Sequence, residues 1–503
     1  MEWLDIEGER FWQRLLIIGL LLNLIVVLTS DLGLDTHVRM AADEDGNLPW
    51  GHTRPVDPHA SDPMDGGTVS SPISESETMI KLQSALQIIV LIAIAGMISI
   101  RLAALVSIYP TFIFSTGRAY QEVGIAIYAA VAVIFLCYYF NRSDGKQKSL
   151  TKRWDLTGKP IHPGFAILAG ISLCAILQIK GIIAMELALI AGVIIGVVAF
   201  ISSKYGVAAF EKIELSTRGI GIIFGGGVML VMLILGFLGY GGTLSVIGDA
   251  PLRYASALAF SVLGVMLIHT FFGMMLWPFI PGMWEMMAEK RDYNSTRNFI
   301  VVSVISAAIT TYVAALWTYE SLLWDSQWPW VIWTMGNNGR YISMLMIPWF
   351  ILLSRLKAQD SSLPSLEEPM SQAKPLLIAI LLILPLSTIT ALHGQTMWSD
   401  EAAVAMKLES DEHFLFVSDS DLGMHWLYTF YEPLGAEENN ITGHWRSDQA
   451  SWIDELTDDL SQVETIVLAP EITDSPLGWS ESASGEVDLL NGGGQWRVLV
   501  RDE

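Results

Sequence analysis

Three segments of the sequence carry side chains that could do chemistry beside a membrane. The first follows an apolar run and reads TSDLGLDTHVR, with ionisable residues at Asp31, Asp35, His37 and Arg39. A carboxylate here could act as a general base on a hydroxyl group, and a histidine or arginine could bind a phosphate. Its continuation carries further ionisable residues, His52, Arg54, Asp57, His59 and Asp62. The alternative interpretation is an acidic, solvated loop.

The other two segments each combine an arginine with a second functional group. In STGRAYQE, Arg118 and Glu122 lie four residues apart, so on a helix they would face the same way. The alternative is an interfacial anchor pair with Tyr120. In NNGRYISMLMIPWF, Arg340 and Tyr341 open an apolar run, and a guanidinium there could hold a phosphate by paired hydrogen bonds. Snorkelling to the interface is the alternative for this arginine.

Composition places these segments on an integral membrane protein. The 503 residues are 52% hydrophobic and only 16% charged, yet the net charge is −23, so the acidic residues must be segregated. Residues 31–78 carry a net charge of −8 and residues 393–503 a net charge of −19, which leaves the remainder slightly basic. No basic face exists to neutralise phosphates along a nucleic acid, so nucleic-acid binding is excluded.

Between the acidic regions lie apolar runs that can cross a hydrocarbon core of ~30 Å. They predict about eleven transmembrane helices, near residues 14–30, 79–99, 103–116, 121–140, 163–179, 181–201, 219–239, 255–279, 298–318, 342–354 and 375–392. Clusters of Lys and Arg before the first run and in the 141–162 loop fall on one side, which the positive-inside rule makes cytoplasmic. This predicts the N-terminus inside and the C-terminus outside.

The predicted domains are a membrane part over 1–392, with 31–78 as its first extracytoplasmic loop, and a soluble tail over 393–503. Helical patterns at 398–408, 424–431 and 448–462 alternate in the tail with strand-like runs such as HFLFVSDSD, TIVLAP and QWRVLV. This alternation predicts a small extracytoplasmic α/β domain.

Few ionisable residues lie inside the predicted spans, which argues against a charged transport path. Glu186 lies near the outer end of its span and could reach interfacial water or line an outer cavity. His269 is more typical of a packed core histidine than of a ligand. The tryptophans at 324, 328, 330 and 333 resemble the aromatic belt of a membrane interface.

This layout resembles the GT-C superfamily of polytopic glycosyltransferases, which includes protein O-mannosyltransferases, aminoarabinose transferases and the catalytic subunit of oligosaccharyltransferase. DLGLDTHVR is similar to the family's acidic first loop, PTFIFSTGRAYQE to its second outer loop, and NNGRYISMLMIPWF to its late outer loop. The resemblance implies Asp35, or Asp31, and Glu122 as catalytic carboxylates. It implies that the donor is bound by His37, Arg39, Arg118, Arg340 and Tyr341.

The activity implied is transfer of a sugar from a polyprenyl- or dolichyl-phosphate donor to a hydroxyl of a protein, lipid or glycan acceptor at the outer membrane face. Asp35 would deprotonate the acceptor in a single, inverting displacement. A divalent cation, Mg or Mn, is compatible with such a site but is not required. Two other classes remain open: a transporter or lipid flippase, and a membrane anchor that presents the tail as a binding module.

Overall fold

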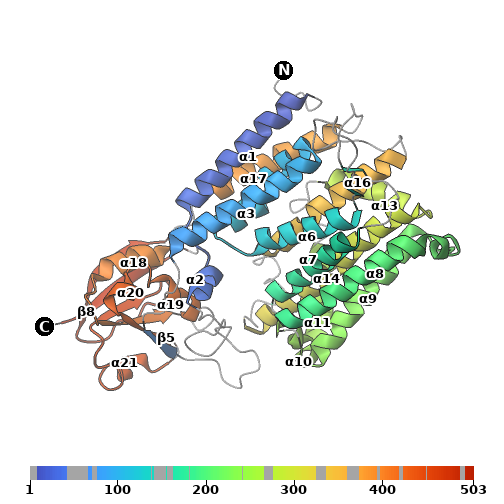
Figure 1. Cartoon of the computed structure of the whole chain (residues 1–503). Coiled ribbons are helices and arrows are strands. Elements are labelled where there is room, and N and C mark those ends of the chain that lie inside the picture. Colours follow the sequence, from blue (N-terminus) through green and yellow to red (C-terminus); the bar gives the residue numbers. More distant parts are fainter. Residues whose placement is uncertain are drawn as a thin grey trace. The chain divides into compact units, whose positions relative to one another are not determined.

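The computed structural model describes residues 8–41, 66–70, 76–137, 139–140, 154–155, 162–180, 182–240, 242–264, 276–323, 336–359, 373–392, 397–418, 423–448, 450–487 and 493–502. The chain divides into two units (Figure 1). The helical unit comprises Met1–Val26, Ala85–Thr116 and Gln121–Leu392, and the sheet unit comprises Val27–Ser84, Gly117–Tyr120 and His393–Glu503.

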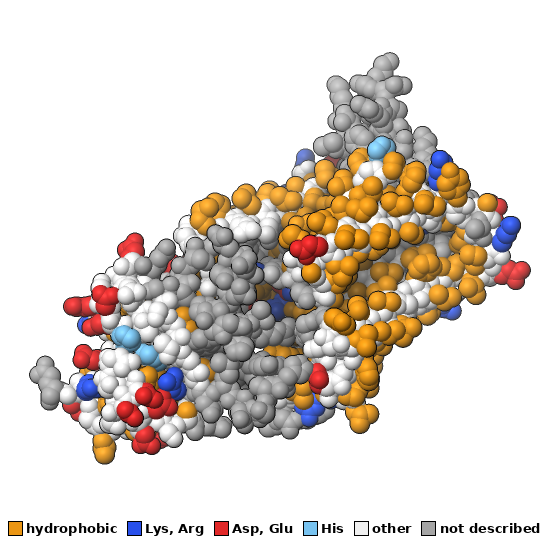
Figure 2. Space-filling view, turned by 60° about the horizontal axis from the view of Figure 1, so that its bottom comes forward, with side chains coloured by type: hydrophobic (Ala, Val, Ile, Leu, Met, Phe, Trp, Pro, Cys, Tyr) orange, Lys and Arg blue, Asp and Glu red, His pale blue; other side chains and the backbone are white. Residues whose placement is uncertain are grey.

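The longer helices of the helical unit are predominantly apolar. In the part of the chain that the structure describes, six are long and apolar enough to cross a membrane: α1 (Glu9–Thr29), α3 (Glu77–Ile98), α8 (Met185–Glu211), α9 (Thr217–Phe237), α14 (Tyr293–Leu323) and α17 (Ala373–Leu392). Apart from α14, these helices expose many leucine, isoleucine and valine side chains, and Figure 2 shows hydrophobic side chains over much of one face of the molecule. Such a surface is suited to lipid, because it would be costly in water.

Shorter helices complete the unit. They are α4 (Ile100–Ser107), α5 (Pro110–Gly117), α6 (Glu122–Cys137), α7 (Pro163–Ile179), η3 (Gly242–Ser245), α10 (Val246–Asp249), α11 (Pro251–Gly264), η5 (Trp277–Phe279), α13 (Ile280–Met286), η7 (Gly336–Leu345) and α16 (Met346–Gln359). Two-residue strand β2 (Tyr139–Phe140), at the end of the run predicted to span over 121–140, pairs with β3 (Trp154–Asp155) in the loop expected at 141–162. The described residues include a helix within each of the eleven runs, although α6, α7 and the apolar segment Arg340–Leu353 are short for a full span.

One predicted span, 103–116, is a pair of helices bent by 57°. The break falls before Pro110, whose ring cannot donate a backbone hydrogen bond and disfavours helix at the preceding residue. Other helices satisfy carbonyl groups at this break. Asn23 of α1 donates to the Ser107 carbonyl at 2.7 Å, and Ser387 of α17 donates to the Ile108 carbonyl at 2.5 Å. These hydrogen bonds satisfy backbone carbonyls inside the protein, as is required where no water is available in the membrane core.

Glycines bring α7 and α8 into backbone contact. Gly192 and Gly196 lie one turn apart on α8, and a Cβ at Gly196 would lie 2.6 Å from the Ala166 carbonyl oxygen of α7. A Cβ at Gly170 would likewise overlap the backbone of α8. This close approach is the small-residue packing expected of helices in lipid.

We therefore expect Gly196→Ala to destabilise the helical unit by about 1–3 kcal/mol, because the two backbones must separate to admit the methyl group. The matched control is Gly227→Ala in α9, where an added Cβ meets no atom within 4 Å. The measurement is the midpoint of unfolding of each purified variant. Equal midpoints for the two variants would show that α7 and α8 do not depend on this contact.

The sheet unit is built on a six-stranded sheet in the order β1-β5-β4-β6-β8-β7. Its strands are β1 (Gly66–Ser70), β4 (His413–Ser418), β5 (Thr442–Ser447), β6 (Thr465–Leu468), β7 (Trp479–Glu486) and β8 (Gln495–Arg501). Strand β4 is parallel to β5 and β6, and the other pairs are antiparallel. The helices are α2 (Leu34–Met40), α18 (Trp398–Met406), α19 (Gly423–Thr429), α20 (Ala436–Asn439) and α21 (Trp452–Glu455).

The tail therefore contains the predicted mixture of helices and strands, but its sheet also takes a strand from the first loop. β1 pairs with β5 from Gly66↔Arg446 to Ser70↔Thr442. The sequence predicted a domain boundary between residues 392 and 393, which places the first loop in the membrane part. In the structure, Val27–Ser84 belongs to the sheet unit instead. Strands β5 and β7 were not among the predicted elements.

Candidate functional site

In the helical unit, the start of α6, the end of α7 and the 3-10 helix η7 bring charged side chains together. Glu122 is the first residue of α6, where a negative charge is stabilised by the helix dipole. Lys180 directly follows α7, where a positive charge is stabilised in the same way. Arg340 lies in η7, which packs against α6. These three side chains form the charged triad.

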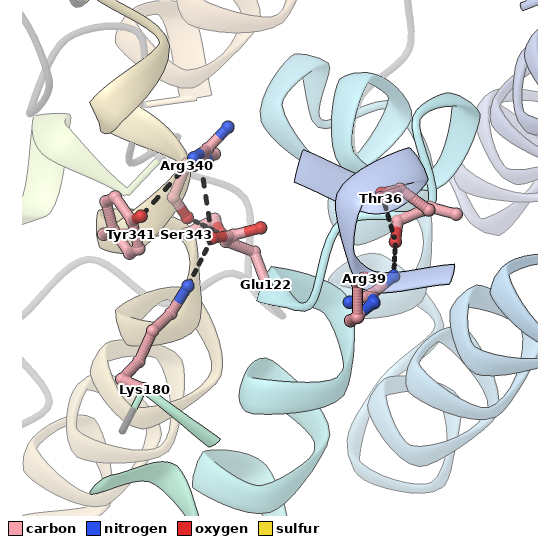
Figure 3. Close-up of polar contacts among 8 residues, drawn as sticks. Thr36, Arg39, Glu122, Lys180, Arg340, Tyr341 and Ser343 are labelled. Atoms are coloured by element: carbon pink, nitrogen blue, oxygen red, sulfur yellow. Dashed lines mark hydrogen bonds and ion pairs between the residues drawn. The ribbon is translucent and has the colours of Figure 1, made fainter. Parts of the chain in front are cut away.

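Both cations of the charged triad approach the same carboxylate oxygen (Figure 3). Lys180 Nζ lies 2.9 Å and Arg340 Nε 3.3 Å from Glu122 Oε1. The Glu122 and Arg340 residues are only 1% and 7% exposed, and the Lys180 side chain is 14% exposed. Among the described residues, two cations therefore contact one carboxylate in a place where little water can screen them.

Tyr341 completes the surroundings of the charged triad. Lys180 Nζ lies 4.7 Å from the centre of its ring and the Arg340 guanidinium carbon 5.3 Å, both within the range of a cation–π contact. Arg340 also donates to the Tyr341 hydroxyl at 3.4 Å, and Ser343 donates to the Arg340 carbonyl. The ring and these bonds hold both cations in place.

The second oxygen of Glu122 is buried and accepts no hydrogen bond from the described residues. A buried carboxylate oxygen without a donor is unfavourable, and two cations held close together repel one another. An anionic ligand that contacts Lys180 and Arg340 would offset this repulsion. Phosphate suits this role because its oxygens match the planar donors of an arginine.

Of the residues predicted from the sequence, Glu122, Arg340 and Tyr341 are thus brought together. The sequence interpretation did not include Lys180. The sequence could have indicated it, because Lys180 is a single cation between two apolar runs. The predicted topology places it on the outer side of the membrane, where Glu122 and Arg340 were also expected. Glu186, in contrast, is exposed in the first turn of α8.

Arg118 is not on a common helix with Glu122. α5 ends at Gly117 and α6 begins at Glu122, and between them Ala119 adopts a positive φ of 54°. Arg118 and Glu122 therefore do not face the same way on one helix, because a turn separates them.

That turn instead holds α2 within the sheet unit. The Arg118 carbonyl accepts hydrogen bonds from the Gly33 N–H at 3.1 Å and the Thr36 hydroxyl at 2.9 Å. Arg39 donates to the Ala119 carbonyl at 3.0 Å (Figure 3). Asp35 and Arg39 are exposed and four residues apart on α2, so both lie on its open face.

His37 and Asp31 have different environments from Asp35. His37 is buried, and burial lowers its pKa to about 4, so it is neutral at neutral pH. Asp31 is half-buried, accepts the Met397 N–H at 2.6 Å, and has its pKa raised by burial. Among the three, Asp35 is the group most accessible to a substrate.

No three His, Cys, Asp or Glu side chains within the described ranges are placed to hold a metal ion. The second half of the first loop, His269 and the four tryptophans before η7 lie outside the described residues. A scan against protein-family models finds no match for this chain, and a search of curated proteins finds no significant relative.

Proposed function

We propose that this chain is a membrane glycosyltransferase of the GT-C type, which transfers a sugar from a polyprenyl- or dolichyl-phosphate donor to an acceptor hydroxyl at the outer membrane face. The observation that carries the proposal is the charged triad, in which Lys180 and Arg340 both contact the carboxylate of Glu122. A largely buried site with two adjacent cations among apolar helices suits a ligand with an anionic head and a lipid tail. A lipid-linked phosphate has both features.

In the proposed reaction, Arg340 and Lys180 bind the donor phosphate. The acceptor oxygen attacks the anomeric carbon, the bond from that carbon to the phosphate oxygen breaks, and polyprenyl phosphate leaves. Arg340 and Lys180 stabilise the negative charge that develops on the departing phosphate. Glu122 keeps both cations in position and acts as their counter-ion.

Asp35 is the proposed base that accepts the proton of the acceptor hydroxyl. Asp31 is less suited, because its carboxylate is half-buried and already accepts the Met397 N–H. The exposed Arg39 on the same face of α2 would assist in orienting the donor or acceptor. A single displacement of this kind inverts the configuration of the sugar.

We expect Asp35→Asn to lower the rate of sugar transfer by about 10²–10⁴-fold, the usual contribution of a general base. Stability should stay within about 0.5 kcal/mol of the unchanged chain, because Asp35 is exposed. The comparison variant is Asp31→Asn. We expect it to affect the free energy of unfolding more than the rate of sugar transfer. The assay follows transfer from a radiolabelled polyprenyl-phosphate sugar, and full activity of the Asp35→Asn protein would remove its role as base.

A second candidate is a flippase for anionic lipids, which the same triad favours because transport paths also carry buried, paired charges. The two functions differ in product. A transferase releases polyprenyl phosphate from its sugar, whereas a flippase moves the intact lipid between leaflets without breaking that bond.

A further inference from the structure

A chain of three hydrogen-bonded side chains crosses one face of the sheet unit and has no part in the proposed sugar transfer. Thr68 on β1, His444 on β5 and His413 on β4 come from three adjacent strands. Thr68 lies directly opposite His444, so both side chains are on the same face of the sheet. His413 lies beside Thr442, two residues before His444, and therefore shares this face. Thr68, His444 and His413 are called here the hydroxyl relay.

The two contacts of the hydroxyl relay have the length of hydrogen bonds. Thr68 Oγ1 lies 2.9 Å from His444 Nδ1, and His444 Nε2 lies 3.0 Å from His413 Nδ1. The centres of the two imidazole rings are 5.3 Å apart, and the ring planes differ by only 18°. This is close to the largest separation that a 3.0 Å contact between two ring atoms allows. The rings therefore meet edge to edge and nearly in one plane, which is the geometry for sharing a proton.

The two ends of the hydroxyl relay are accessible, whereas its middle is not. Thr68 is exposed and His413 is half-buried, but His444 is only 5% exposed. Burial, and then the positive charges of His413 and Arg446, lower the pKa of His444 to about 4, so this imidazole is neutral at neutral pH. A buried imidazole that resists a net charge can still pass a proton, because it can accept one at Nδ1 while it releases another at Nε2.

The hydroxyl relay can therefore withdraw the proton of Thr68. Two arrangements of the protons satisfy both hydrogen bonds, and in one of them Thr68 donates to His444, whose Nε2–H donates to His413. When Thr68 transfers its proton to Nδ1, the proton on Nε2 moves to His413 Nδ1. The positive charge then forms on the half-buried imidazole and not on the buried one. A hydroxyl bonded to a base that is itself oriented by a third group is the arrangement of an activated nucleophile.

A cation lies on the same two strands as the hydroxyl. Arg446 is opposite Gly66, which is two residues from Thr68 on β1, so the arginine is on the same face of the sheet. Its Nη1 donates to the Gly67 carbonyl at 3.3 Å, which places the guanidinium along β1. Its Nε is paired with Glu455 at 2.7 Å, and this ion pair holds it in position. The guanidinium can stabilise negative charge that develops on a group bound at Thr68.

We propose that the hydroxyl relay is a second catalytic site, in which Thr68 is a nucleophile that accepts an acyl group from an ester. Thr68 Oγ1 attacks the ester carbonyl carbon, while its proton passes through His444 to His413. The bond between that carbon and the ester oxygen then breaks, and the alcohol leaves with the proton that the relay returns. The acyl group stays on Thr68 as a new ester. Arg446 stabilises the oxyanion, and none of these steps depends on the proposed sugar transfer.

The test is labelling of the full chain in lipid nanodiscs with an alkyl fluorophosphonate, which reacts with activated hydroxyl groups. The Thr68 oxygen forms a bond to phosphorus, the phosphorus–fluorine bond breaks, and fluoride leaves with the proton that the relay accepted. We expect mass spectrometry of the natural chain to locate the label on Thr68. Ser70 is the internal control, because it is also exposed on β1 but hydrogen-bonds to the Thr442 hydroxyl at 2.9 Å and not to a histidine.

Variants separate the roles within the hydroxyl relay. Labelling should be lost in Thr68→Val, retained in Thr68→Ser, and slowed by about 10²-fold or more in His444→Gln, the contribution of a general base. In the natural chain the rate should rise between about pH 5 and 8, because the relay accepts a proton only while both imidazoles are neutral. His413 acts through His444 and is a positioning residue. His413→Gln should label more slowly and should lose this rise, which loss of a purely structural contact would not cause.

Two results for the natural chain, which need no variant, would overturn the proposal: the absence of a label, or a label on Ser70 in place of Thr68. An unchanged labelling rate in His444→Gln would also overturn it, because the hydroxyl would then not be activated by the relay. Incubation of the natural chain with p-nitrophenyl acetate should acetylate Thr68 with release of nitrophenolate. The absence of an acetyl group on this residue would contradict acyl transfer.

Discussion

Arg340→Met is expected to lower kcat/KM for sugar transfer by about 10²–10³-fold, the loss typical of removing one group that stabilises a developing anion. The substituted side chain keeps most of the aliphatic volume but cannot contact a phosphate. Glu122 still has Lys180 as its counter-ion at 2.9 Å, so the helical unit should remain folded. Lys180→Met should cause a loss of similar size, because both cations face the same carboxylate oxygen.

The matched control is Lys212→Met, which removes an exposed lysine just after α8 and should leave kcat/KM unchanged. All three variants are compared in one assay with the same lipid-linked donor, and folding is checked by size-exclusion chromatography. If the Arg340→Met and Lys180→Met proteins have the same kcat/KM as the control, neither cation contacts the donor phosphate.

Glu122→Gln is expected to have the largest effect on stability. The substitution removes the negative charge that both Lys180 and Arg340 contact, while the two cations stay close together and largely buried. Breaking a buried ion pair by removing one partner typically costs about 3–5 kcal/mol. Either single cation variant should cost less, because one cation and one anion remain paired. The measurement is the midpoint of denaturant-induced unfolding for the three variants.

Glu186→Gln provides the control, since this glutamate also lies in the first turn of an apolar helix but is exposed. Its midpoint should match that of the natural chain. Polyprenyl phosphate should raise the midpoint of Glu122→Gln, because the ligand supplies the missing negative charge. A Glu122→Gln protein as stable as Glu186→Gln would show that the glutamate is not needed as a counter-ion.

Local patterns in the sequence predicted most of the helices. Apolar runs such as those of α1, α8 and α9 are long enough to identify a helix without any tertiary information. The bend between α4 and α5 could have been inferred from Pro110, but its angle depends on the groups that satisfy the exposed carbonyls. Those groups, on Asn23 and Ser387, are distant in sequence.

The strands were less predictable for two physical reasons. β7, with the sequence WSESASGE, is a polar edge strand without a buried alternating face. β1 has only five residues and pairs with a strand about 370 residues away, and a single sequence carries no signal for such a pairing. A solvated loop was one of the two interpretations left open for the first loop, whereas β1 belongs to the sheet.

For the candidate site, the sequence identified individual residues but not the residues with which they pair. Glu122 and Arg340 could be selected because ionisable groups at the ends of apolar runs are costly unless they have a role. The pairing of both with Lys180 depends on how α6, α7 and η7 pack, which no local pattern specifies. Arg118 was grouped with Glu122 because the turn at Ala119 was not apparent from the sequence.

The most direct test of the proposed function is the binding of polyprenyl phosphate, without a sugar, to the purified full chain in lipid nanodiscs, measured by native mass spectrometry. We predict one tightly bound lipid phosphate per chain, retained by Lys212→Met and lost from the folded double variant Lys180→Met/Arg340→Met. No binding to the natural chain, or equal binding to the double variant, would contradict the assignment of the charged triad as the donor phosphate site.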